Sequence, residues 1–355
     1  MATFPSRRRK PTGGSGSRVT RRELFAPFTI AEARRRRGRA TLVIAAVVAA
    51  ACALYSASVG LPDTSPARSA TPTTRRARAS ARTPARTAAR AGAIPGTLQV
   101  ATHTPRAGWT VVARVGGVPA TWLARRAGVT LMRVDQRLVH LVLHAGSSDG
   151  GTAGWTYGDR ITAGEAPLLI AAVNGGFKLT YTNVGFVSRG HVAAPLKAGL
   201  ASLVTYSDGS TNIGSWHAGV PSARTPVFSV LQNQHLLVDH GLAAANVSSC
   251  VIECWGGTIG LQTEVARSAL GITASGQLVW AAGEHLSPSA LASALIGAGA
   301  VRAIELDINP WWVAGYLYPH RPSVTSHVRL VPGQRGVAGA FFKPYTRDFL
   351  TFVAN

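Results

Sequence analysis

Short apolar runs separated by turn residues fill the chain from about residue 96 to its end. The run from Leu168 to Val173 stops at Asn174, Gly175 and Gly176, a pattern typical of a buried strand that closes in a sharp turn. Adjacent glycines also let a ligand approach the backbone closely. The pattern therefore places Asn174 at the lip of a cleft, although Asn-Gly is also an ordinary turn signal.

The rest of this region predicts more strands than helices. Ser287 and Pro288 form an N-cap signal for one helix, and a strand over 301–308 follows it. The chain order of strand, helix and strand predicts a right-handed crossover. The strand-like segments are 109–115, a hairpin over 131–143 with its turn at 135–136, a hairpin at 207–210, a strand pair over 228–238 and a hairpin over 269–283. We expect an α+β fold: a mixed, mostly β-sheet domain with few helices.

The N-terminal part has a different pattern. Residues 1–40 are rich in Arg, Gly, Ser and Pro and predict a disordered basic tail. Residues 41–61 carry no charge and are long enough to span a bilayer as one helix. Residues 62–95 have the Pro/Thr/Ala/Arg composition of a linker. We expect the folded domain to occupy 96–355.

The segment 41–61 has two interpretations. The first is a signal anchor, with the arginine cluster before it kept in the cytoplasm and the C-terminal domain exported through a single-pass membrane protein. The second is a cleaved signal peptide, but the preceding region is long and no clear cleavage site follows. The anchor is favoured, although seven arginines also lie in the linker between Arg68 and Arg90.

Charge is concentrated in the N-terminal part. Residues 1–95 hold 19 Lys/Arg and 3 Asp/Glu, a net charge of +16 out of the total of +22. The remaining +6 belongs to the predicted domain, which has no basic helix and no zinc-finger spacing. We therefore expect no nucleic-acid partner.

Cys250 and Cys254 are the only cysteines outside the predicted membrane span. In an exported domain, two thiols four positions apart favour a small disulfide over a metal site, because the histidines show no zinc-type spacing.

Two acidic residues stand near the end of the strand over 301–308. Strand alternation puts Glu305 and Asp307 on one side, with Cα atoms about 6.6 Å apart. Such a pair can act as a base and a positioning carboxylate, or can be an ordinary solvated face. Trp311 and Trp312 follow, and they could wall a sugar site or fill the core.

Cationic and polar candidates come from three other stretches. Arg267 precedes an apolar strand, where its guanidinium could hold a phosphate or form a structural ion pair with Glu264 or Asp307. Lys178 next to the double glycine could add a second cation. Together with Glu305–Asp307, the segments around Arg267 and His285 are expected to face Asn174.

The ordered motifs resemble those of the phosphodiester glycosidase family. Asn174-Gly175-Gly176-Phe177 resembles the family's Asn-Gly-Gly-Phe, Arg267-Ser268-Ala269-Leu270-Gly271 its Arg-(Ser/Thr)-Ala-x-Gly, and Leu306-Asp307 its late Leu-Asp after a helix. The resemblance covers roughly 131–355. Two departures are Lys178, where the family often has a second Phe, and 308–311, where the family has a glycine-rich run.

The resemblance implies hydrolysis of a sugar 1-phosphodiester at the anomeric carbon, with a glycan or glycopolymer of the cell envelope as substrate. It assigns Asp307, Glu305 and Asn174 to catalysis, with Asp307 as nucleophile or base. The substrate-binding assignments are Arg267, Lys178, Ser268, Gly175, Gly176, His285 and Trp311.

Two other functions fit the same residues. The first is a non-catalytic carbohydrate-binding or scaffold protein, and the second is a phosphoglycosyl transferase-like or other hydrolytic use of the cleft. The sequence requires no cofactor or metal, although carboxylate and Asn oxygens are ligands that Ca²⁺ accepts.

Overall fold

The structure is a computed structural model that describes residues 107–148, 158–258, 260–319, 327–337 and 339–355. All of these residues belong to one compact unit of the chain, Gly96–Asn355. The unit is mostly β-sheet with few helices, as the spacing of short apolar runs predicts. The tail, membrane span and linker predicted over 1–95 lie outside the described residues.

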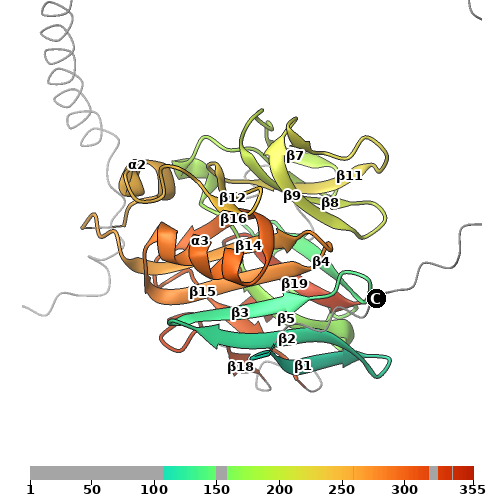
Figure 1. Ribbon diagram of the computed structural model, residues 1–355. Helices are drawn as coiled ribbons and strands as arrows, with labels where there is room; N and C mark the ends of the chain where they lie inside the picture. The colour runs from blue at the N-terminus through green and yellow to red at the C-terminus, as the bar shows by residue number, and fades with distance from the viewer. Residues whose placement is uncertain (1–106, 149–157, 259, 320–326, 338) are drawn as a thin grey trace, which may run out of the picture. The chain divides into compact units, whose positions relative to one another are not determined.

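The largest sheet has eight strands in the order β1-β2-β3-β15-β14-β16-β12-β13 (Figure 1). Its paired strands are antiparallel throughout. The strands are β1 (Thr110–Val115), β2 (Val118–Arg126), β3 (Val129–Val134), β12 (Leu236–Asp239), β13 (Leu242–Ala243), β14 (Val265–Thr273), β15 (Leu278–Leu286) and β16 (Ala300–Ile308).

A second sheet has six strands in the order β10-β9-β8-β11-β6-β7, and a third has five in the order β18-β17-β5-β19-β4. The six are β6 (Phe186–Ser188), β7 (His191–Ala194), β8 (Ala201–Tyr206), β9 (Thr211–Trp216), β10 (Gly219–Val220) and β11 (Val227–Gln232). The five are β4 (Val139–His144), β5 (Leu169–Asn174), β17 (Gly315–Leu317), β18 (Val328–Arg329) and β19 (Phe349–Ala354).

The described helices are short. They are α2 (Val251–Trp255), α3 (Pro288–Gly297) and the single 3₁₀ turns η2 (Ala166–Leu168), η3 (Leu179–Tyr181) and η4 (Ala340–Phe342). None of the helices in the described ranges is long and apolar enough to cross a membrane.

The helix α3 begins as the sequence predicts. The Ser287 side chain accepts a hydrogen bond from the backbone N–H of Ala290, and Pro288 occupies the first turn. Leu291 and Leu295 are buried against the eight-stranded sheet. The helix joins β15 to β16, which run parallel on either side of β14, so the connection is a crossover (Figure 1).

One central core draws on all three sheets. Leu270, Trp280 and Leu306 of the eight-stranded sheet share it with Leu203 of the six-stranded sheet and Phe352 of the five-stranded sheet. Backbone hydrogen bonds join the end of β16 to the residue after β5, and that residue to the start of β19, so strands of two sheets meet there and the candidate site lies at this point.

Two of the predicted strand pairings are wrong. The segment 131–143 is not a hairpin, because β3 pairs with β2 and β15 while β4 pairs with β19 in another sheet. Likewise, β11 and β12 do not pair with each other but belong to different sheets. The hairpins β8–β9 and β14–β15 form as predicted, each around a glycine-containing turn.

Candidate functional site

A cavity of about 550 Å³ lies where β5 and β16 end and β19 begins. Of the predicted site residues, Lys178 and Asp307 line it. The lining is Ser148, Phe177, Lys178, Tyr181, Thr182, Gln234, Gly256, Gly257, Thr258, Asp307, Ile308, Asn309, Trp312, Thr346 and Arg347. This set combines a carboxylate, two cations and three aromatic rings in one space.

Contacts to both its side chain and its backbone hold Asp307 near the end of β16. Its Oδ1 accepts a hydrogen bond of 2.8 Å from the backbone N–H of Ile308, and its Oδ2 forms an ion pair of 2.7 Å with Nη2 of Arg347. Its backbone N–H donates to the carbonyl of Gly175, and its carbonyl accepts from Oγ of Ser268. The carboxylate therefore has a fixed orientation beside a guanidinium group.

Asn174 and Ser268 lie behind the Asp307 carboxylate, on the side away from the cavity. Both are buried and neither lines the cavity. Asn174 Nδ2 donates to Ser268 Oγ over 2.9 Å, and Ser268 Oγ donates to the backbone of Asp307 over 2.9 Å. The structure thus brings the three motifs Asn-Gly-Gly, Arg-Ser and Leu-Asp together, but it gives Asn174 and Ser268 a supporting position.

Arg347 is a site residue that sequence reasoning missed. Besides Asp307, its Nη2 donates to the carbonyl of Gly176 over 2.9 Å, and its Cζ lies 5.0 Å from the centroid of the Trp312 ring. A charged pair directly before the last apolar strand, Arg347-Asp348, was the available signal, because charged residues rarely stand there unless they are paired.

Asp348 explains the first of the two glycines that follow Asn174. Its Oδ2 accepts a hydrogen bond of 2.7 Å from the N–H of Gly176, and its carbonyl accepts one from the N–H of Gly175. A Cβ at Gly175 would collide with the Asp348 carboxylate. Gly175 is therefore a packing position next to β19, and neither glycine lines the cavity.

Lys178 supplies the second cation of the cavity. Its Nζ lies 5.3 Å from the centroid of the Tyr181 ring, and within the described ranges it forms no ion pair. The Tyr181 side chain is 84% exposed at the cavity. Lys178 is thus positioned to meet an anionic group of a ligand.

Arg267 lies outside the cavity lining and is completely buried. Its Nη1 donates to Oε1 of Glu305 over 2.8 Å. Its remaining contacts are with the backbone carbonyls of Leu286, Trp255 and Thr263. This guanidinium therefore forms a structural ion pair, but with Glu305 and not with Glu264 or Asp307, the two acids that the sequence suggested; its predicted contact with substrate stays a prediction.

Glu305 also lies outside the lining, two residues before Asp307. Burial raises the pKa of Glu305 to about 8, because the desolvation of the carboxylate outweighs the attraction and the hydrogen bond of Arg267. Its Oε2 has no hydrogen-bond partner among the described residues. The two acidic residues thus meet different guanidinium groups instead of forming one solvated face.

His285 and Trp311 do not join the cavity lining either. His285 is an exposed residue near the end of β15, and Trp311 is 60% exposed with the Arg335 guanidinium 4.6 Å from its ring centroid. Its neighbour Trp312 is the tryptophan that lines the cavity.

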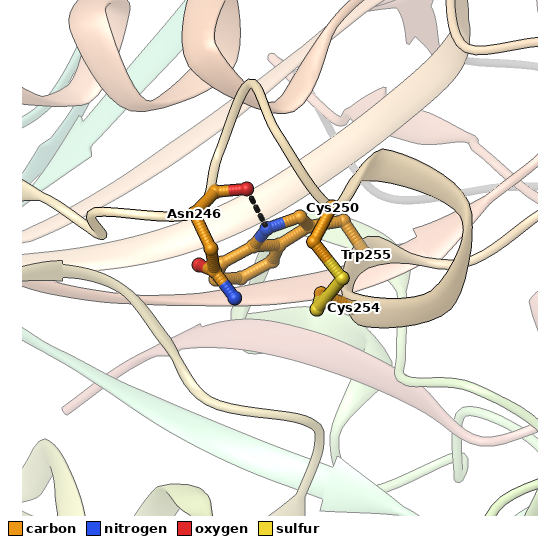
Figure 2. Close-up of a disulfide and its surroundings, with 4 residues drawn as sticks. All are labelled: Asn246, Cys250, Cys254 and Trp255. Atoms are coloured by element: carbon orange, nitrogen blue, oxygen red, sulfur yellow. Dashed lines mark hydrogen bonds between the residues drawn. A yellow bond between two sulfur atoms is a disulfide. The ribbon is translucent and has the colours of Figure 1, made fainter. Parts of the chain in front are cut away.

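Cys250 and Cys254 form a disulfide that closes the turn around α2 (Figure 2). The next residue, Trp255, is buried, and its Nε1 donates to the carbonyl of Asn246 over 3.4 Å, as Figure 2 shows. Gly256, Gly257 and Thr258 follow directly and line the cavity. The disulfide therefore lies next to one wall of the site.

The described residues contain no group of three or more His, Cys, Asp or Glu side chains placed to hold a metal ion. Asp307 is the one carboxylate among the residues described as lining the cavity. A calcium ion would therefore find one carboxylate there, where it usually takes six to eight oxygen ligands.

Comparisons with known proteins were made at three levels. No family model matches the chain, and no curated protein matches it. Among solved structures, the catalytic domain of zebrafish N-acetylglucosamine-1-phosphodiester alpha-N-acetylglucosaminidase, auto-inhibited by its pro-peptide, is 16% identical with a TM-score of 0.43, over 66% of this chain and 78% of that chain. A hypothetical protein from Synechocystis is 12% identical with a TM-score of 0.37, over 68% and 63%. At most, these similarities concern the fold.

Proposed function

We propose that this protein hydrolyses a sugar 1-phosphodiester at the anomeric carbon. The observation that carries the proposal is the cavity in which Asp307 meets Lys178, Arg347 and Trp312. The two cations suit a phosphodiester, and an aromatic ring suits the apolar face of a sugar. The sequence motifs that resemble those of the phosphodiester glycosidase family, in the same order along the chain, imply the same activity.

One carboxylate is enough for this reaction. Phosphate leaves without a strong general acid, so the cavity needs a carboxylate near the anomeric carbon and cations near the departing oxygen. As a base, Asp307 takes a proton from the water molecule that attacks the anomeric carbon; as a nucleophile, it forms a covalent bond to that carbon, and water breaks this bond in a second step. On either route the C1–O bond breaks with its electron pair going to the phosphate oxygen. Water supplies the new hydroxyl group, and the products are the free sugar and a phosphomonoester. Lys178 and Arg347 bind the phosphate, while Asn174 and Ser268 hold the strand end that carries Asp307.

The test is release of sugar from a synthetic N-acetylglucosamine-1-phosphodiester by the purified full-length chain. Asp307→Asn should lower kcat by about 10²- to 10⁴-fold, because the nucleophile or base is lost. Asp239→Asn makes the same chemical change at an exposed position on β12 and should leave the rate unchanged. Equal activity of Asp307→Asn and wild type, with both folded, would contradict the assignment.

A binding protein is the second candidate, and one observation favours it. Both oxygens of Asp307 already accept contacts, from Ile308 and from Arg347, and these contacts lower the electron density that the carboxylate can offer to an anomeric carbon. Saturable binding of an envelope glycopolymer by both wild type and Asp307→Asn, without turnover by either, would establish this function instead.

The proposed location is the outer side of the cell membrane, with residues 41–61 as a single-pass anchor and a glycan phosphodiester of the cell envelope as substrate. The support is the uncharged stretch and the arginines before it. Protease treatment of intact cells, followed by detection of the C-terminal domain, tests it: digestion from outside supports the orientation, and protection contradicts it.

A further inference from the structure

The wall segment of the cavity, defined as Gly256, Gly257 and Thr258, has little to hold it in place by itself. Two of its three residues are glycines, and Gly256 has a φ of +82°. It leaves α2, a helix of only five residues. A segment of this kind needs contacts from outside to keep one conformation.

Those contacts come from Arg267. Its Nη1 donates to the carbonyl of Trp255, directly before the wall segment, over 2.8 Å. Its Nη2 donates to the carbonyl of Thr263, five residues after the segment, over 3.2 Å. One planar guanidinium group therefore fixes both chain ends that lead into and out of the wall.

The same guanidinium ties the wall to the strand that carries Asp307. Its Nη1 also pairs with Glu305 on β16, and Glu305 precedes Asp307 by two residues. The wall itself lies against the cavity, because a Cβ placed on Gly256 would come within 3.0 Å of both Ile308 and Phe177. Movement of the wall would therefore change the space between residues that line the site.

We propose that Arg267, with Glu305, is a positioning residue that sets the shape of the substrate cavity by clamping the wall segment to β16. It contacts no substrate and acts through the carbonyls of Trp255 and Thr263. The part of this inference that concerns substrate rests on the proposed function, whereas the clamp itself does not.

Hydrogen exchange measured by mass spectrometry on the full-length chain tests the clamp without any substrate. In Arg267→Lys, an ammonium group keeps the charge opposite Glu305 but lacks the planar fork that reaches several carbonyls. We expect exchange in the peptide covering 250–264 to become at least about tenfold faster, with exchange in α3 unchanged. Arg302→Lys, in a β16 arginine that donates to Asn212, is the matched control and should leave 250–264 unchanged.

A second variant covers the case in which Arg267→Lys does not fold. Arg267→Met combined with Glu305→Met removes both members of the buried ionisable pair together, a replacement that is often neutral or stabilising for a fold. This double variant still lacks the clamp, so its 250–264 peptide should also exchange faster. Unchanged exchange in a folded variant of either kind would overturn the proposal.

Kinetics on the synthetic phosphodiester then separate shaping of the site from a structural role. The wall binds but does not react, so KM should rise about tenfold in Arg267→Lys while kcat changes less than threefold. Faster exchange with an unchanged KM would overturn the positioning role.

If wild type shows no turnover, the proposed function fails, and the affinity for N-acetylglucosamine 1-phosphate, measured by calorimetry, replaces KM. A wild type that does not bind this probe either overturns the part of the proposal that concerns substrate, whereas faster exchange of 250–264 still supports the clamp.

Discussion

At the scale of single residues, Gly175 and Gly176 look equivalent in the sequence but have different neighbours. A Cβ on Gly175 would lie 2.8 Å from the backbone carbonyl carbon of Asp348 and would collide with its carboxylate. A Cβ on Gly176 would meet methyl groups of Leu231 at 3.2 and 3.3 Å, and a leucine side chain can shift. The first position therefore requires glycine, and the second only favours it.

Gly175→Ala should lower the free energy of unfolding by about 2–3 kcal/mol or more, because neither the backbone nor the hydrogen-bonded Asp348 can move away. Gly176→Ala should lower it by less than about 1.5 kcal/mol. Urea unfolding of the two variants gives the comparison. Equal losses would show that the contact with Asp348 does not distinguish the two positions.

Residue-level chemistry was only partly predictable. Asp307 and Lys178 were found because motif order and a turn next to a strand are visible in the sequence. Arg347 was missed because its contact with Asp307 joins strands of two different sheets, and no local pattern encodes that pairing. Arg267 was singled out in the sequence, but its role could not be predicted. An arginine before a strand gives no indication whether its guanidinium group binds a ligand or donates to buried backbone carbonyls.

At the scale of elements, the spacing of apolar residues and the turn residues predicted where strands lie. They did not always predict which strands pair with one another. Hairpins β8–β9 and β14–β15 were predicted because a tight turn forces neighbouring strands to pair. The chain crosses from one sheet to another between β3 and β4, where Asp135 accepts two backbone hydrogen bonds in a turn that also looks like a hairpin. Sheet membership depends on the shared core, which a local pattern does not show.

The element α2 carries a prediction of its own. Its disulfide closes a ring with a sequence separation of four, so its entropic stabilisation is at most about 2 kcal/mol. Cys250→Ser with Cys254→Ser should therefore lower the free energy of unfolding by no more than that, because the contacts of Trp255 with Asn246 and Arg267 remain. Urea unfolding measures the loss, with Cys52→Ser as the control. A variant that does not fold would show that the disulfide supports more than its own turn.

At the scale of the whole molecule, the site lies where two of the three sheets that share one core come together. Asp307 ends a strand of the eight-stranded sheet, whereas Arg347 and Lys178 adjoin strands of the five-stranded sheet. The same arrangement buries Glu305 among strands and helices, away from water. The stability of the whole fold therefore responds to the protonation of a group that lies behind the site.

The sign of this response follows from the direction of the shift. Glu305 has a pKa of about 8 in the folded chain, against 4.5 for an ordinary glutamate, so the folded state holds a proton that the unfolded state has lost between these values. The stabilisation is complete below about pH 4.5 and is lost as the pH rises through about 8, with a slope of at most about 1.4 kcal/mol per pH unit. Glu305→Gln does not titrate, so its free energy of unfolding should decline less over this window in urea unfolding at pH 5 to 8.

Glu165 provides a control of opposite sign. Burial alone would raise the pKa of Glu165, but the contacts from His144 and Thr351 lower it below its ordinary value. Its contribution is present above about pH 4.5 and is lost in acid, so Glu165→Gln should flatten the loss of stability that wild type shows as the pH falls below about 4.5. A slope that is the same in Glu305→Gln and wild type would show that Glu305 already carries its charge in the folded chain, with Arg267 offsetting the cost of burial.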